Sequence, residues 1–327
     1  MQIITGAAGF IGSRMLQKLN EEGERDFILV DEFSREDKNK NFEGKQYLET
    51  IDRDIFIDWL LDNASRVDGI IHLGARTDTT EKNAAIFDRL NLNYTKDLWT
   101  ICTENSIPFV YASSAATYGL GEYGYEDRHD IVTKLKPLNP YGVSKNDFDI
   151  WALQQERQPP YWAGLKFFNV YGPNEYHKGR MASVIFHTFN QIKATGGMKL
   201  FKSHRPDIQH GHQSRDFVYI KDVVDMVRFL YRQQPEIGLF NIGTGKARTF
   251  LDLATSTFHS LGLEPNISFI DTPADIRDTY QYFTEAKMDK IRKAGYDKPF
   301  YSLEEGVADY VRRYLVTKLP PNHQSTS

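Results

Sequence analysis

The first half of the chain alternates short apolar runs with segments of helical pattern. Residues 12–22 and 84–104 carry the helical spacing, and Gly23 closes the first of them. This β-α-β alternation predicts an α/β fold with a doubly wound parallel sheet and helices on both faces. The apolar runs, which read as buried parallel strands, are Gln2–Thr5, Phe27–Val30, Gly69–Leu73 and Pro108–Ala112.

The pattern changes after a further predicted strand at Gly164–Phe168. Longer loops follow, including the polar stretch Ser203–Ser214. We expect a dinucleotide-binding domain over residues 1–167, with segments at about 216–240 returning to it. A smaller α/β substrate-binding domain is expected over 168–215 and 241–315, and a flexible tail over 316–327. Predicted elements of this half are the strand Leu239–Ile242 and the helices Asp222–Arg232 and Thr249–Leu261.

Composition narrows the class of protein. The 327 residues are 40% hydrophobic and 26% charged, as in an ordinary globular protein. A net charge of −4 argues against nucleic acid or an anionic membrane as the main partner. The single cysteine, Cys102, excludes an internal disulfide and a cysteine-rich metal site. With no signal peptide or transmembrane stretch recognised, we expect a cytoplasmic protein without a metal.

A glycine loop follows the first predicted strand and opens the first helix. Gly6, Gly9 and Gly12 allow a tight turn and a close approach of the backbone to a pyrophosphate, which the helix N-terminus then attracts. An acidic residue, Asp31, ends the second strand where it can accept hydrogen bonds from an adenosine ribose. Together these features favour a Rossmann-type dinucleotide site over a plain strand–turn–helix.

The residues after Asp31 leave the choice of cofactor open. Asp31 and Glu32 favour NAD, whereas Arg35 and Lys38 offer cations to the 2′-phosphate of NADP. A solvated loop is the alternative interpretation for these two cations.

Tyr141 and Lys145 lie four residues apart, directly after Pro140, on one face of a predicted helix. We expect the ammonium to lower the pKa of the tyrosine, which makes Tyr141 a candidate acid/base, and Lys145 could also bind the nicotinamide ribose. The preceding strand ends at Ser114, whose hydroxyl could bond the reacting oxygen or simply satisfy a turn.

These residues, with Asn169-Val170-Tyr171-Gly172-Pro173, resemble the extended short-chain dehydrogenase/reductase family. More narrowly, the chain is similar to the nucleotide-sugar epimerases that act on ADP-heptose. The most specific part of this resemblance is Tyr176-His177-Lys178-Gly179-Arg180-Met181-Ala182-Ser183-Val184.

The resemblance implies the conversion of ADP-D-glycero-D-manno-heptose to its L-glycero epimer, for the inner core of lipopolysaccharide. It implies a transient oxidation at C6 by a tightly bound cofactor, usually NADP in this family, with NAD possible here. Tyr141 and Lys178 are then the two proton carriers, Lys145 and Ser114 assist them, and the subunits form a homo-oligomer, a pentamer in the family.

Two further sets of residues are carried over from the family. Cofactor contacts are implied for Phe10, Ile11, Asp31, Glu32, Lys38, Arg53, Leu73, Gly74, Ala75, Arg76, Thr77, Asn91, Lys145, Val170 and Lys178, beside the glycines of the loop. Substrate contacts are implied for Ser114, Asn169, Arg180, His187, Phe201, Lys202, Ser203, His204, Arg215 and Tyr280.

Some positions depart from the family pattern. Glu32, Arg180 and the run Lys202-Ser203-His204 stand where the family has other residue types. A nucleotide-sugar 4-epimerase or dehydrogenase therefore remains an alternative. A 4,6-dehydratase is disfavoured because Ala115 and Ala116 replace its acidic pair. A non-catalytic dinucleotide-sensing protein is the alternative from another class, although such proteins typically lose the Tyr–Lys pair.

Overall fold

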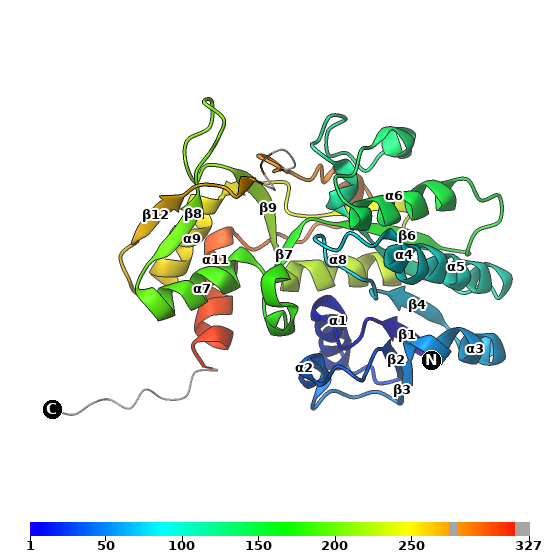
Figure 1. Cartoon of the computed structure of the whole chain (residues 1–327). Coiled ribbons are helices and arrows are strands. Elements are labelled where there is room, and N and C mark those ends of the chain that lie inside the picture. The colour runs from blue at the N-terminus through cyan, green and yellow to red at the C-terminus, as the bar shows by residue number, and fades with distance from the viewer. Residues whose placement is uncertain (275–276, 278–279, 318–327) are drawn as a thin grey trace.

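A parallel sheet forms the centre of the molecule. The computed structural model describes residues 1–274, 277 and 280–317. Its largest sheet has the strand order β10-β6-β5-β4-β1-β2-β3, with every neighbouring pair parallel. The doubly wound α/β fold is therefore confirmed (Figure 1). The strands are β1 Gln2–Thr5, β2 Phe27–Asp31, β3 Glu49–Asp52, β4 Gly69–His72, β5 Phe109–Ser114, β6 Trp162–Phe167 and β10 Gly238–Ile242.

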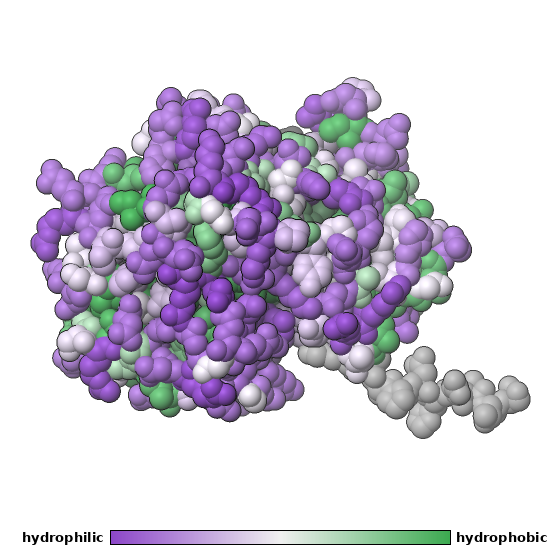
Figure 2. All heavy atoms as spheres, turned by 180° about the vertical axis from the view of Figure 1, so that it is seen from behind, coloured by the Kyte–Doolittle hydropathy of each residue, from purple (hydrophilic) through white to green (hydrophobic). Residues whose placement is uncertain are grey.

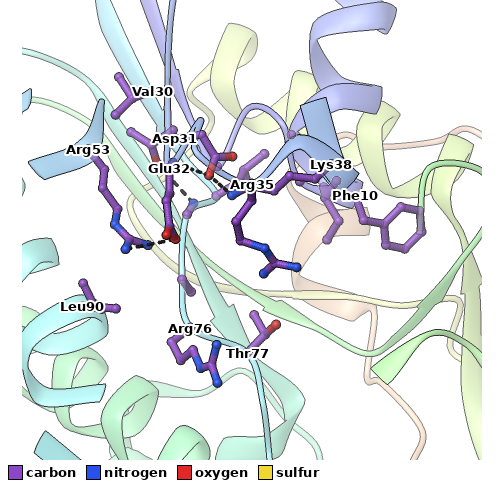
Figure 3. Close-up of a pocket in the computed structure, with 18 of the residues that line it drawn as sticks. Phe10, Val30, Asp31, Glu32, Arg35, Lys38, Arg53, Arg76, Thr77 and Leu90 are labelled. Carbon is purple, nitrogen blue, oxygen red and sulfur yellow. Dashed lines mark hydrogen bonds and ion pairs between the residues drawn. The ribbon is translucent and has the colours of Figure 1, made fainter. Parts of the chain in front are cut away.

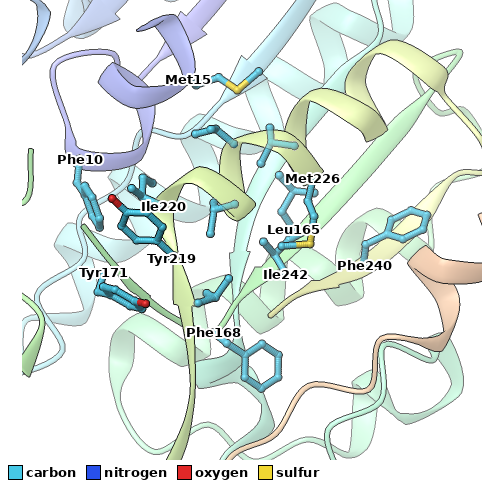
Figure 4. Close-up of a cluster of buried hydrophobic side chains, with 14 of the residues drawn as sticks. Phe10, Met15, Leu165, Phe168, Tyr171, Tyr219, Ile220, Met226, Phe240 and Ile242 are labelled. Atoms are coloured by element: carbon cyan, nitrogen blue, oxygen red, sulfur yellow. The ribbon is translucent and has the colours of Figure 1, made fainter. Parts of the chain in front are cut away.

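Helices cover both faces of this sheet because successive strand side chains point to opposite sides. Ile4 belongs to the core that includes α1 (Phe10–Glu21) and α8 (Ile220–Gln233). Met15 of α1 and Met226 of α8 lie in that core (Figure 4). Its neighbour Ile3 belongs to the core on the other face, with side chains of α3 (Arg53–Asn63), α5 (Tyr94–Glu104) and α6 (Pro140–Leu153).

The helical pattern over residues 84–104 is confirmed, but its middle is not an ordinary α-helix. A short helix α4 (Ala84–Phe87) passes into a π-helical turn at Asp88–Asn93, and α5 follows without a break. The turn widens the helix where it meets α6, with which it is in contact.

A smaller region lies beside the large sheet, at the left of Figure 1. There α7 (Val184–Thr195) and α9 (Phe250–Ser260) pack on the strands β8 (Met198–Phe201) and β12 (Ile267–Ile270), around Ile192, Leu200 and Phe258. Its strands are β7 Asn169–Tyr171, β9 Ser214–Tyr219 and β11 Ala247–Thr249 in one sheet, and β8 Met198–Phe201 and β12 Ile267–Ile270 in another. The remaining helices are α2 Glu36–Asn39, α7 Val184–Thr195, α9 Phe250–Ser260, α10 Asp289–Lys293 and α11 Leu303–Tyr310.

Each strand and helix expected from the sequence occurs, with ends shifted by a few residues. The pair β3–α3 was not predicted. Asn241 and Ile242, assigned above to the smaller domain, lie on β10 and pair with β6 of the large sheet. The two-domain division itself stays a prediction, and residues 318–327 of the predicted tail lie outside the described residues.

Within the described part of the chain, no helix is both long and apolar enough to cross a bilayer. The face shown in Figure 2 is mainly hydrophilic, with apolar side chains in small separate areas.

Candidate active site

A cavity of about 540 Å³ opens at the carboxyl ends of β1, β2 and β4. This is the edge of a doubly wound sheet where ligands bind, and the volume suits a cofactor. Most of the cofactor residues expected from the sequence line it (Figure 3). They are Gly6, Gly9, Phe10, Ile11, Gly12, Asp31, Glu32, Lys38, Arg53, Leu73, Gly74, Ala75, Arg76, Thr77 and Lys178.

The glycine loop is shaped for a close backbone approach. Gly6 has φ +66°, and a Cβ there would lie 2.6 Å from the nitrogen of Gly74. A Cβ on Gly12 would lie 2.2 Å from the carbonyl oxygen of Gly6. Helix α1 starts after Gly9, and its first N–H groups receive no cap from a described side chain. They are therefore available to a phosphate.

The end of β2 carries two carboxylates, each paired with a cation. Asp31 accepts from Ala8 N at 2.9 Å and forms an ion pair with Lys38. Glu32 lies 3.1 Å from Arg53. Arg35 lines the same cavity and lies 2.8 Å from Asp37 (Figure 3 shows its guanidinium in the opening). The acidic charge that argued for NAD is thus balanced in the structure.

His72, at the end of β4, also lines the cavity and was missed by sequence reasoning. Thr95 donates its hydroxyl hydrogen to the carbonyl of Asn91, so His72 Nε2 must donate to Thr95 Oγ1 at 3.1 Å. His72 Nδ1 then accepts from Thr5 at 2.6 Å, and Thr5 Oγ1 accepts from Gly74 N at 3.1 Å. Burial lowers the pKa of His72 to about 3, so this relay stays neutral. Its signal in the sequence is a polar residue at the end of an apolar strand.

Asn91 stabilises the loop after β4 that lines the cavity. It is buried in the π-helical turn, and its amide bonds both backbone groups of Arg76, at 2.8 and 3.0 Å. The same amide donates to Ser144 Oγ on α6 at 3.1 Å. Asn91 therefore links the loop after β4 to the helix of Tyr141, and is not among the residues lining the cavity.

Helix α6 places Tyr141 and Lys145 as the sequence predicted. Asn139 caps it through Gly142 N at 2.8 Å. The expected lowering of the pKa of Tyr141 is wrong for this structure. Burial raises it, and a hydrogen bond from Ser114 only partly opposes that shift. Burial instead lowers the pKa of Lys145 to about 8, because a desolvated ammonium is disfavoured.

A sealed polar network lies behind these residues. Asp149, two turns along α6 from Tyr141, accepts from Tyr111 at 2.9 Å and Ser113 at 2.7 Å, both on β5. Lys166 on β6 donates to Asp149 and to Thr117. The network joins α6 to the strands that end at the site.

Lys178 reaches the cavity from the loop between β7 and α7. Its ammonium lies 5.5 Å from the ring centroid of Phe10. Burial lowers the pKa of Lys178, and the charge of Glu175 opposes this shift.

Apart from Ser114, the expected substrate residues fall into two groups. Phe201 and Tyr280 have ring centroids 6.3 Å apart, and Arg215 lies 5.6 Å from the Tyr280 ring. The Arg215 guanidinium is buried and donates to the carbonyls of Ser214 and Gln281. Lys202 lies 3.2 Å from Asp271. Ser203 and His204 line a second, open pocket of about 560 Å³.

The second group is Asn169, Arg180 and His187. His187 on α7 bonds the carbonyl of Arg180 at 3.3 Å, and Asn169 starts β7 with an exposed side chain. Val170 pairs with Val218 of β9. Ser114, Tyr141, Lys145 and Val170 are not among the residues that line the first cavity. Residues there that the sequence did not suggest include Thr5, Ile86, Arg89, Leu90, Tyr94 and His177.

Comparison with known proteins gives a consistent result. Residues 2–243 match the model of the NAD dependent epimerase/dehydratase family. The chain is 50% identical over 325 residues to the ADP-L-glycero-D-manno-heptose-6-epimerase of Fusobacterium nucleatum, covering 96% of this chain and 98% of that protein. It is 48% identical to the enzyme of the same name from Nitratidesulfovibrio vulgaris, covering 98% and 99%.

The structure agrees with these matches. The crystal structure of the Helicobacter pylori ADP-L-glycero-D-manno-heptose-6-epimerase superposes with a TM-score of 0.76 at 27% identity, covering 95% of each chain. The resemblance stated from the sequence is thereby confirmed, and the chain belongs to the NAD dependent epimerase/dehydratase family.

Proposed function

We propose that this chain converts ADP-D-glycero-D-manno-heptose to ADP-L-glycero-D-manno-heptose at C6, for the inner core of lipopolysaccharide. The observation that carries the proposal is the position of Lys178, which lines the same cavity as the glycine loop. Lys178 belongs to the segment that distinguishes this group of epimerases in the sequence. The identity to two proteins of that name over nearly the whole chain supports the same conclusion.

The cavity fits a nicotinamide dinucleotide, whose chemistry when bound is reversible hydride transfer. The glycine loop would hold the pyrophosphate, Asp31 the adenosine ribose, and the loop at Leu73–Thr77 the opposite wall. We propose NADP, because Lys38 and Arg53 neutralise the two carboxylates while Arg35 lines the same wall. NAD remains the alternative.

Tyr141 and Lys178 would carry the protons. Burial shifts their pKa values in opposite directions, up for Tyr141 and down for Lys178. At working pH the phenol therefore keeps its proton, and the ammonium releases one more readily than an exposed lysine does. One residue would take the proton of the C6 hydroxyl in one pose of the sugar. The other would return a proton to the transient ketone after the side chain has rotated. Ser114 would hold the reacting oxygen and Lys145 the nicotinamide ribose.

The substrate nucleotide would lie against the Arg215 group, and Asn169, Arg180 and His187 would face the sugar. The buried Arg215 uses two of its five N–H donors on the carbonyls of Ser214 and Gln281, which leaves donors for a diphosphate. We further propose that the protein is cytoplasmic and forms a homo-oligomer. Sedimentation of the purified protein tests the assembly.

Proton NMR of the purified protein with ADP-D-glycero-D-manno-heptose tests the activity. We expect the L-glycero epimer to appear without any net change in cofactor redox state. Tyr141→Phe and Lys178→Met should each slow conversion by about 100-fold or more, the usual contribution of a general acid or base. Tyr123→Phe and Lys193→Met are matched controls outside the cavity and should convert at the wild-type rate.

Failure of the wild-type protein to convert this sugar, with NADP and then NAD supplied, would exclude the assignment. UDP- and GDP-hexoses would then be the substrates to examine.

A further inference from the structure

The loop that carries Lys178 has an unusual backbone. Asn174 has φ +79° and Gly179 has φ +53°, both in the left-handed region. After Asn174, the segment Tyr176–Met181 forms only short 3-10 turns, interrupted at Gly179. Gly179 adopts this conformation freely, whereas at Asn174, a non-glycine residue, it carries a cost that surrounding contacts must offset.

Glu175 supplies those contacts. Its side chain is fully buried. Oε2 accepts from Ser183 N at 2.5 Å, and Oε1 accepts from the Ser183 hydroxyl at 2.7 Å and Gly172 N at 3.4 Å. Its backbone carbonyl accepts from Lys178 N at 2.9 Å. One residue thus joins the end of β7, the backbone of Lys178 and Ser183, which caps α7 through Phe186 N.

The carboxylate of Glu175 is also a charge facing Lys178. Both of its oxygens accept from N–H or O–H donors, the pattern of an ionised carboxylate. Burial raises the pKa of Glu175, and the hydrogen bonds of Ser183 together with the charge of Lys178 oppose this. The negative charge of Glu175 stabilises the ammonium of Lys178.

The other titratable groups near this pair do not replace Glu175. Burial lowers the pKa of His177 to about 4, so this neighbour of Lys178 is neutral at working pH. Burial raises the pKa of the phenols of Tyr176, on the loop, and Tyr310, on α11, and the charge of Glu175 raises both further. Both phenols therefore stay neutral as well.

Building on the proposed role of Lys178 as a proton carrier, we infer that Glu175 is its positioning residue. The buried carboxylate closes the loop from Gly172 to Ser183, and its charge keeps the Lys178 ammonium available over the cavity. Glu175 lines neither described pocket, so it acts through Lys178 and not on the ligand.

Competitive labelling of the intact protein tests this. Acetic anhydride reacts with the free amine, so labelling of Lys178 across pH 6 to 10, read by mass spectrometry, gives its titration midpoint. We expect Glu175→Gln to lower that midpoint by about one pH unit and kcat by about tenfold, with a smaller change in KM. Asp222→Asn is the matched control, since Asp222 is another buried acid that accepts a backbone N–H, from Tyr301. It should leave the midpoint unchanged.

Two more variants distinguish the effect of the Glu175 charge from the effect of its side-chain length and hydrogen bonds. They also keep the test informative if Glu175→Gln does not fold. Glu175→Asp keeps the charge on a shorter side chain, and Ser183→Ala removes one donor to it. Both should keep the midpoint and lower kcat several-fold. A wild-type midpoint in Glu175→Gln, or wild-type kcat in both other variants, would overturn the inference. The midpoint is independent of substrate, so a failed epimerase assay of the wild type would reject the proposed function separately.

Discussion

Lys166 on β6 and Asp149 on α6 form an ion pair of 2.7 Å in which neither side chain is more than 1% exposed. Asp149 also accepts from Tyr111 and Ser113, so its charge is surrounded by donors. Removing one member leaves the other charge buried without its partner. We expect Lys166→Met to lower the free energy of unfolding by about 3–5 kcal/mol, measured by urea denaturation.

The double variant Lys166→Met/Asp149→Leu provides the control for that experiment. It removes both charges, so it should lose clearly less stability than the sum of the two single variants. Additive losses would mean that the pair acts as two independent hydrogen-bonding groups.

His72 offers a test of the cofactor cavity that does not involve the reaction. His72→Phe keeps the ring that packs near Tyr94 and Phe109, but it leaves the Thr5 hydroxyl hydrogen without its acceptor and removes one donor to Thr95 Oγ1. We expect NADP to bind about tenfold more weakly by fluorescence titration, because an unpaired buried polar group costs about 1–3 kcal/mol.

His129→Phe is the matched control for this measurement. Its ring packs near Trp162 and accepts from Leu239 N, away from the cavity, so stability should fall without a change in NADP affinity. Equal affinity in His72→Phe and wild type would show that the relay does not shape the site.

Arg35 decides, on our proposal, between the two nicotinamide dinucleotides. Its guanidinium lines the cavity, and its side chain is 45% exposed. Arg35→Ala should weaken NADP binding by about tenfold and leave NAD binding unchanged, because only NADP offers a phosphate to a charge-assisted hydrogen bond. Calorimetric titration measures both constants. Lys40→Ala, an exposed cation of the same segment, is the control. An equal loss for both cofactors would contradict this role.

Asp222 predicts a pH dependence of stability. Burial raises its pKa from 3.8 to about 7. The folded protein therefore binds a proton that the unfolded chain releases, and stability falls as pH rises from about 4 to about 7. The slope attributable to Asp222 is roughly 1 kcal/mol per pH unit. Urea denaturation at pH 5, 6 and 7 measures it. Asp222→Asn should flatten the curve in this window, and an identical slope in both proteins would refute the prediction.

Much of the fold follows from local pattern. The strand β1 and the loop Gly6–Gly12 were found because apolar runs and glycines are short-range signals. The pair β3–α3 was missed because α3 has no clear apolar stripe: Phe56 and Leu60 are buried while Ile55 and Leu61 are exposed. Only the neighbouring strand β2 makes the segment at Glu49–Asp52 a strand.

Sequence motifs predicted those candidate site residues that lie close together in the chain. Tyr141 and Lys145 lie four residues apart on one helix, and this spacing, downstream of the glycine loop, made them candidates. His72, Thr95 and Thr5 are separated by up to 90 positions in the chain, and only the folded sheet brings them together. The pKa of Tyr141 was predicted with the wrong sign because burial, which the sequence does not report, outweighs the hydrogen bond of Ser114.

The π-helical turn at Asp88–Asn93 has a consequence for how this protein can tolerate change in length. A turn of this kind contains one residue more than an α-helix of the same rise. Deleting a single residue there would convert it to regular helix and rotate Asn91 away from Arg76 and Ser144. The chain would keep its fold and lose the link between two walls of the site. The one additional residue in this turn therefore allows a helix that packs on the sheet to connect two walls of the site.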